Sequence, residues 1–348
     1  MRREPEMAAT SSSPAIPPRL SAWRRARGTR VGLFAVWLAG LAILPALLSD
    51  YDTYLAAQVM IYAIATLGLD IVYGRAGQLS LAHASFFGLG AYVAALSTGF
   101  NVPLWLQPFL VVALAVLAGA VVAVPTLRLS GLRLALVTLL FGELFTWAID
   151  HTGDLTGGSE GITVPPLTVG AFDSSNPLHA YMLTAVVSVL ATLLSLQLGR
   201  TQYGRRMLAV RDSELASQAV GVPIVRTKIV AFILAAIFAG IAGWLYAYAV
   251  GFISPTTFDL FGSVYFLVAV ILGGSGKVLG AWLGALYIVL IPDVFTTIGY
   301  PNLFPILGGG VLIAVALLLP GGLVDGASRL LRMVSRAYKG GTAGPARI

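Results

Sequence analysis

The placement of the basic residues constrains this fold most, because one threading through a membrane puts all 22 lysines and arginines on one side. In this threading, ten apolar stretches cross the membrane in alternating directions, starting from a cytoplasmic N-terminus. They cover residues 31–48, 54–73, 78–99, 105–125, 134–149, 180–198, 229–250, 259–273, 278–296 and 303–319. The connections on the other side contain only acids, namely Asp50, Asp52, Asp150, Asp154, Glu160 and Asp173. This is the positive-inside pattern, and it predicts about ten spans with both termini in the cytoplasm.

Composition supports a membrane protein built of helices. The chain has 348 residues, of which 57% are hydrophobic and 11% are charged, whereas about 25% of a soluble domain is charged. Backbone groups in lipid must pair within their own segment, which favours helices. The apolar stretches do not alternate as the strands of a membrane barrel would. The predicted fold class is therefore an all-α polytopic membrane protein.

Several classes of function are disfavoured by the residues present. The net charge of +7 is spread over short loops, so no nucleic-acid partner is expected. There is no cysteine, and His83, His151 and His179 are scattered, so we expect no metal and no cofactor. The stretch from Gly273 to Lys277 is similar to a phosphate loop, but Val278 stands where Ser or Thr is required. The chain is not expected to hydrolyse ATP or to be an enzyme.

The chain divides into a basic N-terminal extension, predicted to be disordered, at 1–30, a transmembrane domain at 31–322, and a basic tail at 323–348. Two connections within the domain are long: an ordered outer loop or short re-entrant element at 150–178, and an inner loop at 199–228. In the inner loop, Asp212 or Ser213 can cap a helix, Gly221 suits the position after its end, and Pro223 forbids continuation. We therefore predict a short helix at 213–220.

Two inner turns have similar sequences, one from Gly74 to Gly77 and the other from Gly273 to Gly276. Each precedes a span that begins with small residues, which let helix backbones approach closely. Transporters often contain two related halves with helices interrupted by glycine. A weak internal repeat and a chance match both remain open, and the four glycines are predicted to be structural.

Polar residues within spans are candidates for a translocation path, because a charge at the bilayer centre costs at least about 2.5–3.5 kcal/mol. Asp70 lies near the inner end of its span and can pair with Arg75, which favours a structural role. Glu143 lies mid-span and should face the bundle interior or a water-filled path. Gln58, His83 and Ser85 could line the same path or make hydrogen bonds between helices.

Four segments in order resemble one family. The stretch Gly68–Tyr92 fits the pattern G-x-A-G-Q-x-S-L-x-H-A-x-F-x-G-x-G-A-Y at nearly every place. The other three segments are Leu155–Ile162, Tyr203–Gly221 and Leu272–Gly284. Together they resemble the LivM type of the LivH/LivM permeases, which serve ABC importers of branched-chain amino acids. The resemblance covers about residues 54–322, and permeases for urea and short amides share much of it.

This resemblance implies an assembly in the bacterial inner membrane. The chain would pair with a homologous LivH-like permease, bind two cytoplasmic ATPases, and receive substrate from a periplasmic binding protein. Glu214, Ala216 and Gly221 match the E-x-A…G core of the ATPase-coupling loop. The wider set of expected coupling residues is Arg211, Asp212, Glu214, Leu215, Ala216, Ala219 and Gly221.

The predicted mechanism is alternating access, in which the ATPases move the helix at 213–220 as a rigid lever. Two other classes stay open at this level. A secondary transporter or channel would work without an ATPase, and would typically have ion-coupling acids deep in several spans, where here there is mainly Glu143. A membrane enzyme would gather polar catalytic groups at one face, and the sequence has no such cluster.

Overall fold

The computed structural model describes residues 39–127, 129, 131–169 and 172–300, and further positions at 303, 309, 310, 314, 317, 319, 321–326 and 328. The chain forms two units, Met1–Leu48 and Ser49–Ile348, and each is described by itself. In the first unit, residues 39–43 are helical and are followed by the short 3-10 helix η1 (Leu44–Ala46). All of the predicted extension at 1–30 and most of the tail at 323–348 lie outside the described residues, so these boundaries stay predictions.

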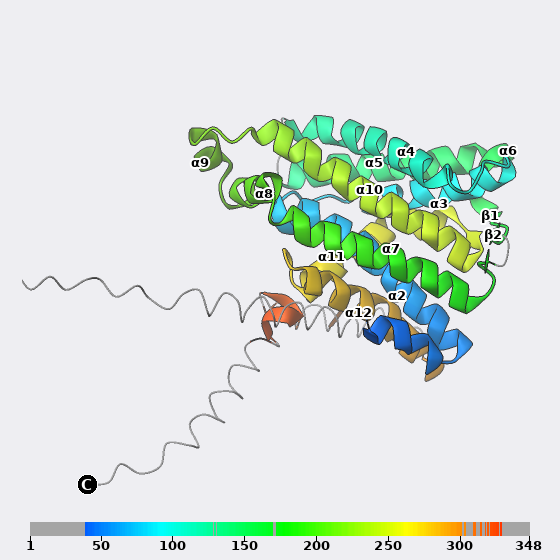
Figure 1. Ribbon diagram of the computed structural model, residues 1–348. Coiled ribbons are helices and arrows are strands. Elements are labelled where there is room, and N and C mark those ends of the chain that lie inside the picture. The colour runs from blue at the N-terminus through cyan, green and yellow to red at the C-terminus, as the bar shows by residue number, and fades with distance from the viewer. Residues whose placement is uncertain are drawn as a thin grey trace, which may run out of the picture. The chain divides into compact units, whose positions relative to one another are not determined.

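The second unit is a bundle of helices (Figure 1). Its first helix, α2 (Asp50–Leu69), continues into one π-helical turn, η2 (Asp70–Arg75). The other long helices are α3 (His83–Gly99), α4 (Gln107–Ala123), α5 (Leu132–His151), α7 (Pro177–Leu198), α10 (Ile224–Val250), α11 (Leu260–Gly273) and α12 (Val278–Thr297). The short elements η3 (Val124–Leu127) and η5 (Pro255–Phe258) are 3-10 turns.

Eight of the ten predicted spans coincide with these helices, namely α2 with η2, α3, α4, α5, α7, α10, α11 and α12. Among the described residues, 5 helices are long and apolar enough to cross a membrane, and α4 and α11 are apolar but shorter. The predicted span at 31–48 is described only from residue 39 onward, and the one at 303–319 lies largely outside the described residues. The count of ten spans and the sides of the termini therefore remain predictions.

The start predicted for the third span was wrong. Residues 76–82 are not helical, and α3 begins at His83 rather than at position 78. Side chains of other helices replace the helical partners here: Thr138 Oγ1 of α5 accepts from the Leu81 N–H at 2.9 Å, and Ser263 Oγ of α11 accepts from the Ala84 N–H at 3.0 Å. Because these N–H groups are satisfied, the chain can stay non-helical inside the bundle.

Helix α10 lies at the centre of the second unit and packs on α2, α3 and α4. Small residues allow this packing. A side chain at Gly90 of α3 would overlap the carbonyl of Gly240, and one at Gly243 would overlap the carbonyl of Phe87. In a membrane, where burial of apolar surface gives helices little reason to associate, such close backbone approach lets van der Waals contacts hold them together.

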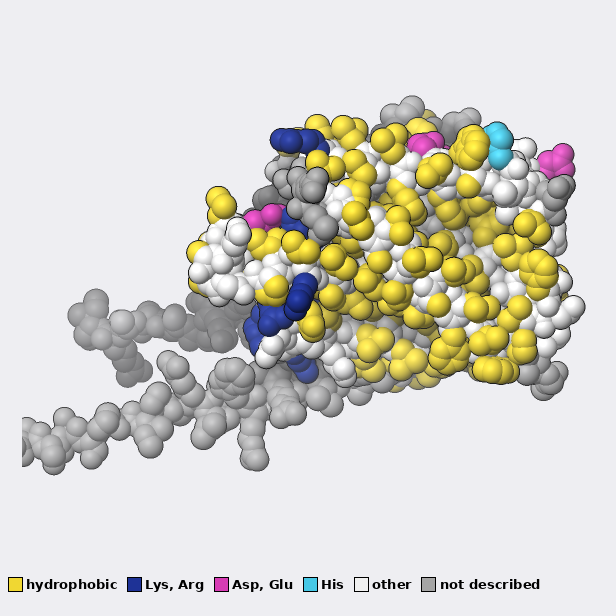
Figure 2. Space-filling model, turned by 90° about the horizontal axis from the view of Figure 1, so that it is seen from above, with side chains coloured by type: hydrophobic (Ala, Val, Ile, Leu, Met, Phe, Trp, Pro, Cys, Tyr) yellow, Lys and Arg dark blue, Asp and Glu magenta, His cyan; other side chains and the backbone are white. Residues whose placement is uncertain are grey.

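The outer faces of the bundle are apolar. Helix α5 exposes Leu136, Leu140, Leu144 and Trp147 along one side. Only 22% of its apolar span is buried within the bundle, whereas 78% of the span Asp50–Arg75 is buried. Helix α5 therefore lies at the periphery. Figure 2 shows hydrophobic side chains over the flank of the bundle, with Lys and Arg at one end. A surface of this kind suits a hydrocarbon environment.

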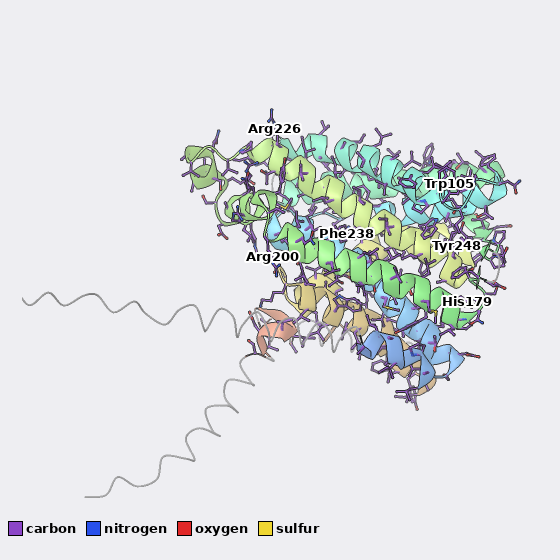
Figure 3. The ribbon with its side chains drawn as sticks, viewed as in Figure 1. Trp105, His179, Arg200, Arg226, Phe238 and Tyr248 are labelled. Atoms are coloured by element: carbon purple, nitrogen blue, oxygen red, sulfur yellow. The ribbon has the colours of Figure 1, made fainter. Side chains whose placement is uncertain are left out.

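The two ends of the bundle differ in charge. Arg200 and Arg226 lie at the end that holds α8 and α9, whereas Trp105, His179 and Tyr248 lie at the other (Figures 1 and 3). We call the first the basic end. The far end contains the ordered loop predicted at 150–178, which forms α6 (Gly153–Thr156), η4 (Gly158–Glu160), β1 (Ile162–Thr163), β2 (Thr168–Val169) and β3 (Phe172–Asp173). Strand β1 pairs antiparallel with β4 (Phe252–Ile253), and β2 pairs with β3.

Candidate functional site

The segment predicted as a loop at 199–228 contains two helices and the first residues of α10, which begins at Ile224 rather than at 229, where the sequence predicted only one helix. Helix α8 (Gln202–Asp212) was not expected, and α9 (Glu214–Ala219) is shorter than the predicted 213–220. Ser213 separates them with an extended backbone, and its Oγ accepts from the Ala216 N–H at 3.2 Å. Ser213, rather than Asp212, is therefore the N-cap.

The end of α9 is closed by glycine, as predicted. Gly221 has φ 78°, which favours a residue without a side chain. Its N–H donates to the Gln218 carbonyl at 3.0 Å, and the Val222 N–H donates to the Ser217 carbonyl at 2.9 Å. This pair of bonds is a Schellman motif. Helix α9 is thus capped at both ends, which gives a short helix a definite geometry.

Glu214 joins α9 to two other parts of the bundle. Its Oε1 lies 2.7 Å from Lys228 Nζ on α10 and accepts from Gln78 Nε2 at 3.4 Å. Lys228 is buried, with its side chain 5% exposed. A buried ammonium needs such a carboxylate, because an unpaired buried charge is costly. The first turn of α9 is therefore tied to α10 and to the non-helical segment before α3.

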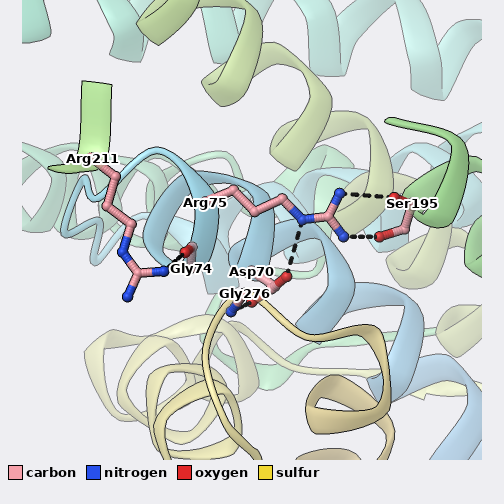
Figure 4. A network of polar contacts seen from close by, with 6 residues as sticks. All are labelled: Asp70, Gly74, Arg75, Ser195, Arg211 and Gly276. Carbon is pink, nitrogen blue, oxygen red and sulfur yellow. Dashed lines mark hydrogen bonds and ion pairs between the residues drawn. The ribbon is translucent and has the colours of Figure 1, made fainter. Parts of the chain in front are cut away.

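Arg211, near the end of α8, contacts both glycine turns. Its Nη1 donates to the carbonyl of Gly74 (Figure 4). A side chain at Gly77 would lie 3.2 Å from the Arg211 Cα, and one at Gly276 would lie 3.2 Å from Nη1. The guanidinium group thus fits against both turns because their glycines leave room for it.

Beneath Arg211 lies a buried ion pair between Asp70 and Arg75, which confirms the predicted pairing. Arg75 Nε is 3.4 Å from Asp70 Oδ2, and the two side chains are 6% and 1% exposed. Arg75 also donates to the carbonyl of Ser195 at 2.8 Å and to its Oγ at 2.6 Å. The Gly276 N–H donates to Asp70 Oδ1 at 2.6 Å (Figure 4). The pair links η2, α7 and the turn between α11 and α12.

The two glycine turns singled out in the sequence therefore meet in space. A side chain at Gly74 would lie 2.6 Å from the Gly276 backbone nitrogen. Gly273 has a separate role, because a side chain there would overlap the carbonyl of Gly280 on α12. Close packing is therefore sufficient to account for the glycines of both turns. Whether the two turns descend from an internal repeat stays open.

Helix α9 presents an apolar face that no described residue covers. Leu215 is 82% exposed and Val220, just after the helix, is 77% exposed. Asp212, Ala216 and Ala219 are exposed as well. The expected coupling residues thus form two groups: Arg211 and Glu214 contact the bundle, and the rest are free within the described chain to meet another surface.

Two of the candidate path residues, His83 and Ser85, are buried inside the bundle, and a third, Gln58, is half-buried on α2. His83 is buried, and its Nε2 lies 2.7 Å from the Ala65 carbonyl of α2. Gln58 donates to the Tyr54 hydroxyl one turn away at 2.6 Å. Ser85 is buried, and its Oγ has no hydrogen-bond partner among the described residues. Hydrogen bonds within the bundle account for the polar side chains of His83 and Gln58. They do not account for the buried hydroxyl of Ser85.

Glu143 has a different environment. It is exposed on α5, one residue after Gly142. A side chain at Gly142 would lie 3.3 Å from Ser85 Oγ. The bundle interior, one of the two surroundings expected for Glu143, is therefore not where it lies. A path bounded partly by another chain stays a prediction.

Several site residues were missed or given no role in the sequence. Ser195 is one serine in an apolar helix, and Gln78 is part of a motif without an assigned function. Lys228 was counted only as an inner charge. The sequence offers a weak indication of a special role for Lys228, because it directly precedes an uncharged stretch. Its ammonium group must therefore either pair with an acid inside the protein or extend into water. Within the described chain, no group of three His, Asp or Glu side chains could hold a metal ion.

Apolar outer faces and long apolar helices held together by small residues define a multi-pass membrane protein. A family model for the permease component of the branched-chain amino acid transport system matches residues 53–316. The chain belongs to this family.

Similar proteins include permeases for different cargoes. LivM of the high-affinity branched-chain amino acid transport system of Escherichia coli K12 is 31% identical, over 88% of this chain and 78% of LivM. LsrC, the autoinducer 2 import permease of Enterobacter sp. strain 638, is 28% identical over 89% of this chain and 93% of LsrC. LivH of Salmonella typhimurium LT2 is 25% identical over 76% of this chain and 91% of LivH. No solved structure matches the chain.

The buried ion pair yields a stability prediction. Asp70→Asn leaves the Arg75 charge buried without its carboxylate, which typically costs about 3–5 kcal/mol. We expect a clearly lower melting temperature for the purified protein in detergent. Asp325→Asn is the control, because Asp325 pairs with Lys277 and both side chains are more than one third exposed; such pairs contribute about 0–1 kcal/mol. Equal melting temperatures for the two variants would contradict a structural role for the buried pair.

Proposed function

We propose that this chain is the LivM-type permease subunit of an ATP-driven importer for branched-chain amino acids in the bacterial inner membrane. The observation that carries the proposal is the similarity to LivM across 88% of the chain. The network at the basic end supports it, because an importer driven from outside the chain needs a rigid contact point joined to its spans. Cations at that end favour the cytoplasmic side, where the ATPases would be.

The proposed partners follow from this role. A homologous LivH-like permease would complete the channel, two ATPase subunits would bind at the basic end, and a periplasmic binding protein would deliver substrate at the far end. The exposed apolar face of α9, with Leu215 and Val220, has the character of a protein contact. Asp212, Ala216 and Ala219 would lie at its edge. ATP hydrolysis would take place in the partner subunits.

The coupling mechanism uses α8 and α9 together. Movement of α9 by the ATPases would pull on α10 and on the segment before α3 through Glu214. It would pull on η2 through Arg211 and the Gly74 carbonyl. The π-helical turn of η2 and the glycine turns lie where helices can change direction at small cost, and π turns are frequent at functional sites. Coupling requires that these contacts differ between the inward-open and outward-open states.

The translocation path is proposed to run along α5. A carboxylate facing lipid at mid-span costs at least about 2.5–3.5 kcal/mol, so Glu143 is better placed against water or protein. Its exposure on a peripheral helix suits a path between this chain and the second permease. The buried Ser85 hydroxyl, behind Gly142, and its neighbour His83 would then lie just inside the path wall, and the half-buried Gln58 of α2 stays a candidate for the same path.

Cargo and energy source are tested by uptake. We expect labelled leucine, isoleucine and valine, and not urea or autoinducer 2, to enter proteoliposomes that contain both permeases, the ATPases and ATP, with binding protein outside. Uptake should require hydrolysable ATP. Uptake of urea or a short amide in place of the amino acids would reassign the cargo within the same family. Uptake by the permease alone would indicate an ATP-independent transporter or channel and overturn the proposal.

The Arg211 contact should be needed for coupling. We expect Arg211→Ala to lower leucine uptake about tenfold, within the usual range of coupling free energies, while ATP hydrolysis and the amount of assembled complex stay near normal. Arg200→Ala is the matched control, because Arg200 is an exposed arginine at the same end. If uptake by Arg211→Ala equals that of the control, Arg211 does not transmit the movement.

The role of Glu143 in the translocation path can be tested with a substitution that removes its charge but keeps the shape of the side chain. We expect Glu143→Gln to change the rate of uptake while the complex assembles normally and its melting temperature stays the same. Glu160→Gln is the control, because Glu160 is an exposed acid of the outer loop. A raised melting temperature with unchanged uptake would indicate that Glu143 faces lipid, since neutralisation would then remove an unfavourable burial.

A further inference from the structure

The basic end contains a groove that the proposed transport mechanism does not use. It lies between α8 and the start of α10 and has a volume of about 350 Å³. Its walls include Tyr203 and Arg206 from α8, and Arg226, Ile229 and Val230 from α10. The residues come from two helices that the loop at 213–223 connects, so a ligand in the groove would contact both sides of the coupling loop.

One part of the groove is strongly cationic. Within the described part of the chain, the ion pairs of the cations involve Arg75, Lys228 and Lys277, so no carboxylate neutralises Arg206 or Arg226. The Arg206 guanidinium carbon lies 5.6 Å from the centre of the Tyr203 ring. This cation–π contact holds the guanidinium group at the groove while leaving its N–H donors available. Two arginine forks in one groove match the oxygens of a phosphate group.

The other part of the groove is apolar and points into the membrane-spanning part of α10. Ile229 and Val230 are partly buried and begin the stretch 229–250, which contains no charged residue. Arg226 lies about one turn before this stretch. The groove therefore crosses the level at which the bilayer passes from headgroups to hydrocarbon. A free phosphate would use only its polar part, whereas a phospholipid would use both.

We propose that this groove binds an anionic phospholipid. The lipid phosphate lies between the guanidinium groups of Arg206 and Arg226, and an acyl chain runs along Ile229 and Val230. Bound in this way, the lipid joins α8 to α10 beside the coupling loop. The site depends on the chain's position in the membrane, and not on the identity of its cargo or on the partner ATPases.

The test measures lipid binding to the purified full-length chain in detergent by native mass spectrometry. We expect phosphatidylglycerol to bind more tightly than phosphatidylcholine. The double variant Arg206→Gln/Arg226→Gln should weaken phosphatidylglycerol binding at least about tenfold, because it removes both charged hydrogen-bond donor groups of the groove. Arg133→Gln is the control, because Arg133 is exposed near the start of α5 and does not line the groove.

A second measurement on the unaltered protein needs no variant. We expect phosphatidylglycerol to raise its melting temperature in detergent, while inorganic phosphate at the same concentration does not. Equal stabilisation by phosphate would assign the groove to a soluble anion and overturn the lipid proposal. So would unchanged phosphatidylglycerol binding by the double variant, or an equal loss in Arg133→Gln, which would indicate diffuse attraction to the basic end.

Discussion

The buried ion pair of Asp70 and Arg75 is the constraint on which the basic end depends. A charge pair away from water is tolerated only when the remaining donors and acceptors are also satisfied. Here Ser195 accepts one hydrogen bond from each terminal nitrogen of the guanidinium group, and the Gly276 N–H donates to the second carboxylate oxygen. Satisfying two charges thus brings η2, α7 and the turn between α11 and α12 to one place. The position of Arg211 against Gly74 and Gly276 follows from that arrangement.

Away from this end, the bundle is held by close backbone contact. Glycine and alanine line the surface of α10 that meets α3, and Gly90, Gly240 and Gly243 allow the two backbones to touch. Large apolar residues also cover the outer faces of α5 and α7, where a soluble bundle would be polar. This design leaves the peripheral helices free to meet lipid or a second subunit while the centre stays rigid.

The coupling loop combines a rigid contact element with firm attachments. Helix α9 is capped by Ser213 and Gly221, and its outer face is not covered by any described residue. Glu214 and Arg211 connect it to four parts of the bundle: α10, the segment before α3, η2 and the turn before α12. A push on the outer face therefore reaches several spans through short polar contacts. The lipid groove proposed between α8 and α10 lies on the same structural unit, so the bilayer itself would brace the element that the ATPases move.

Features that depend on near neighbours along the chain could be predicted from the residues alone. The apolar stretches predicted eight described helices, the charges predicted a basic end, and the caps of α9 and the pairing of Asp70 with Arg75 followed from residues only a few positions apart. The contacts between distant groups emerge only from the way the helices pack. Arg211 contacts Gly74 across 137 positions, Gly276 binds Asp70 across 206, and Arg75 binds Ser195 across 120. This packing also decided that α3 begins at His83 and that Glu143 faces outward, because these depend on side chains that other helices supply and on which face each helix turns to its neighbours.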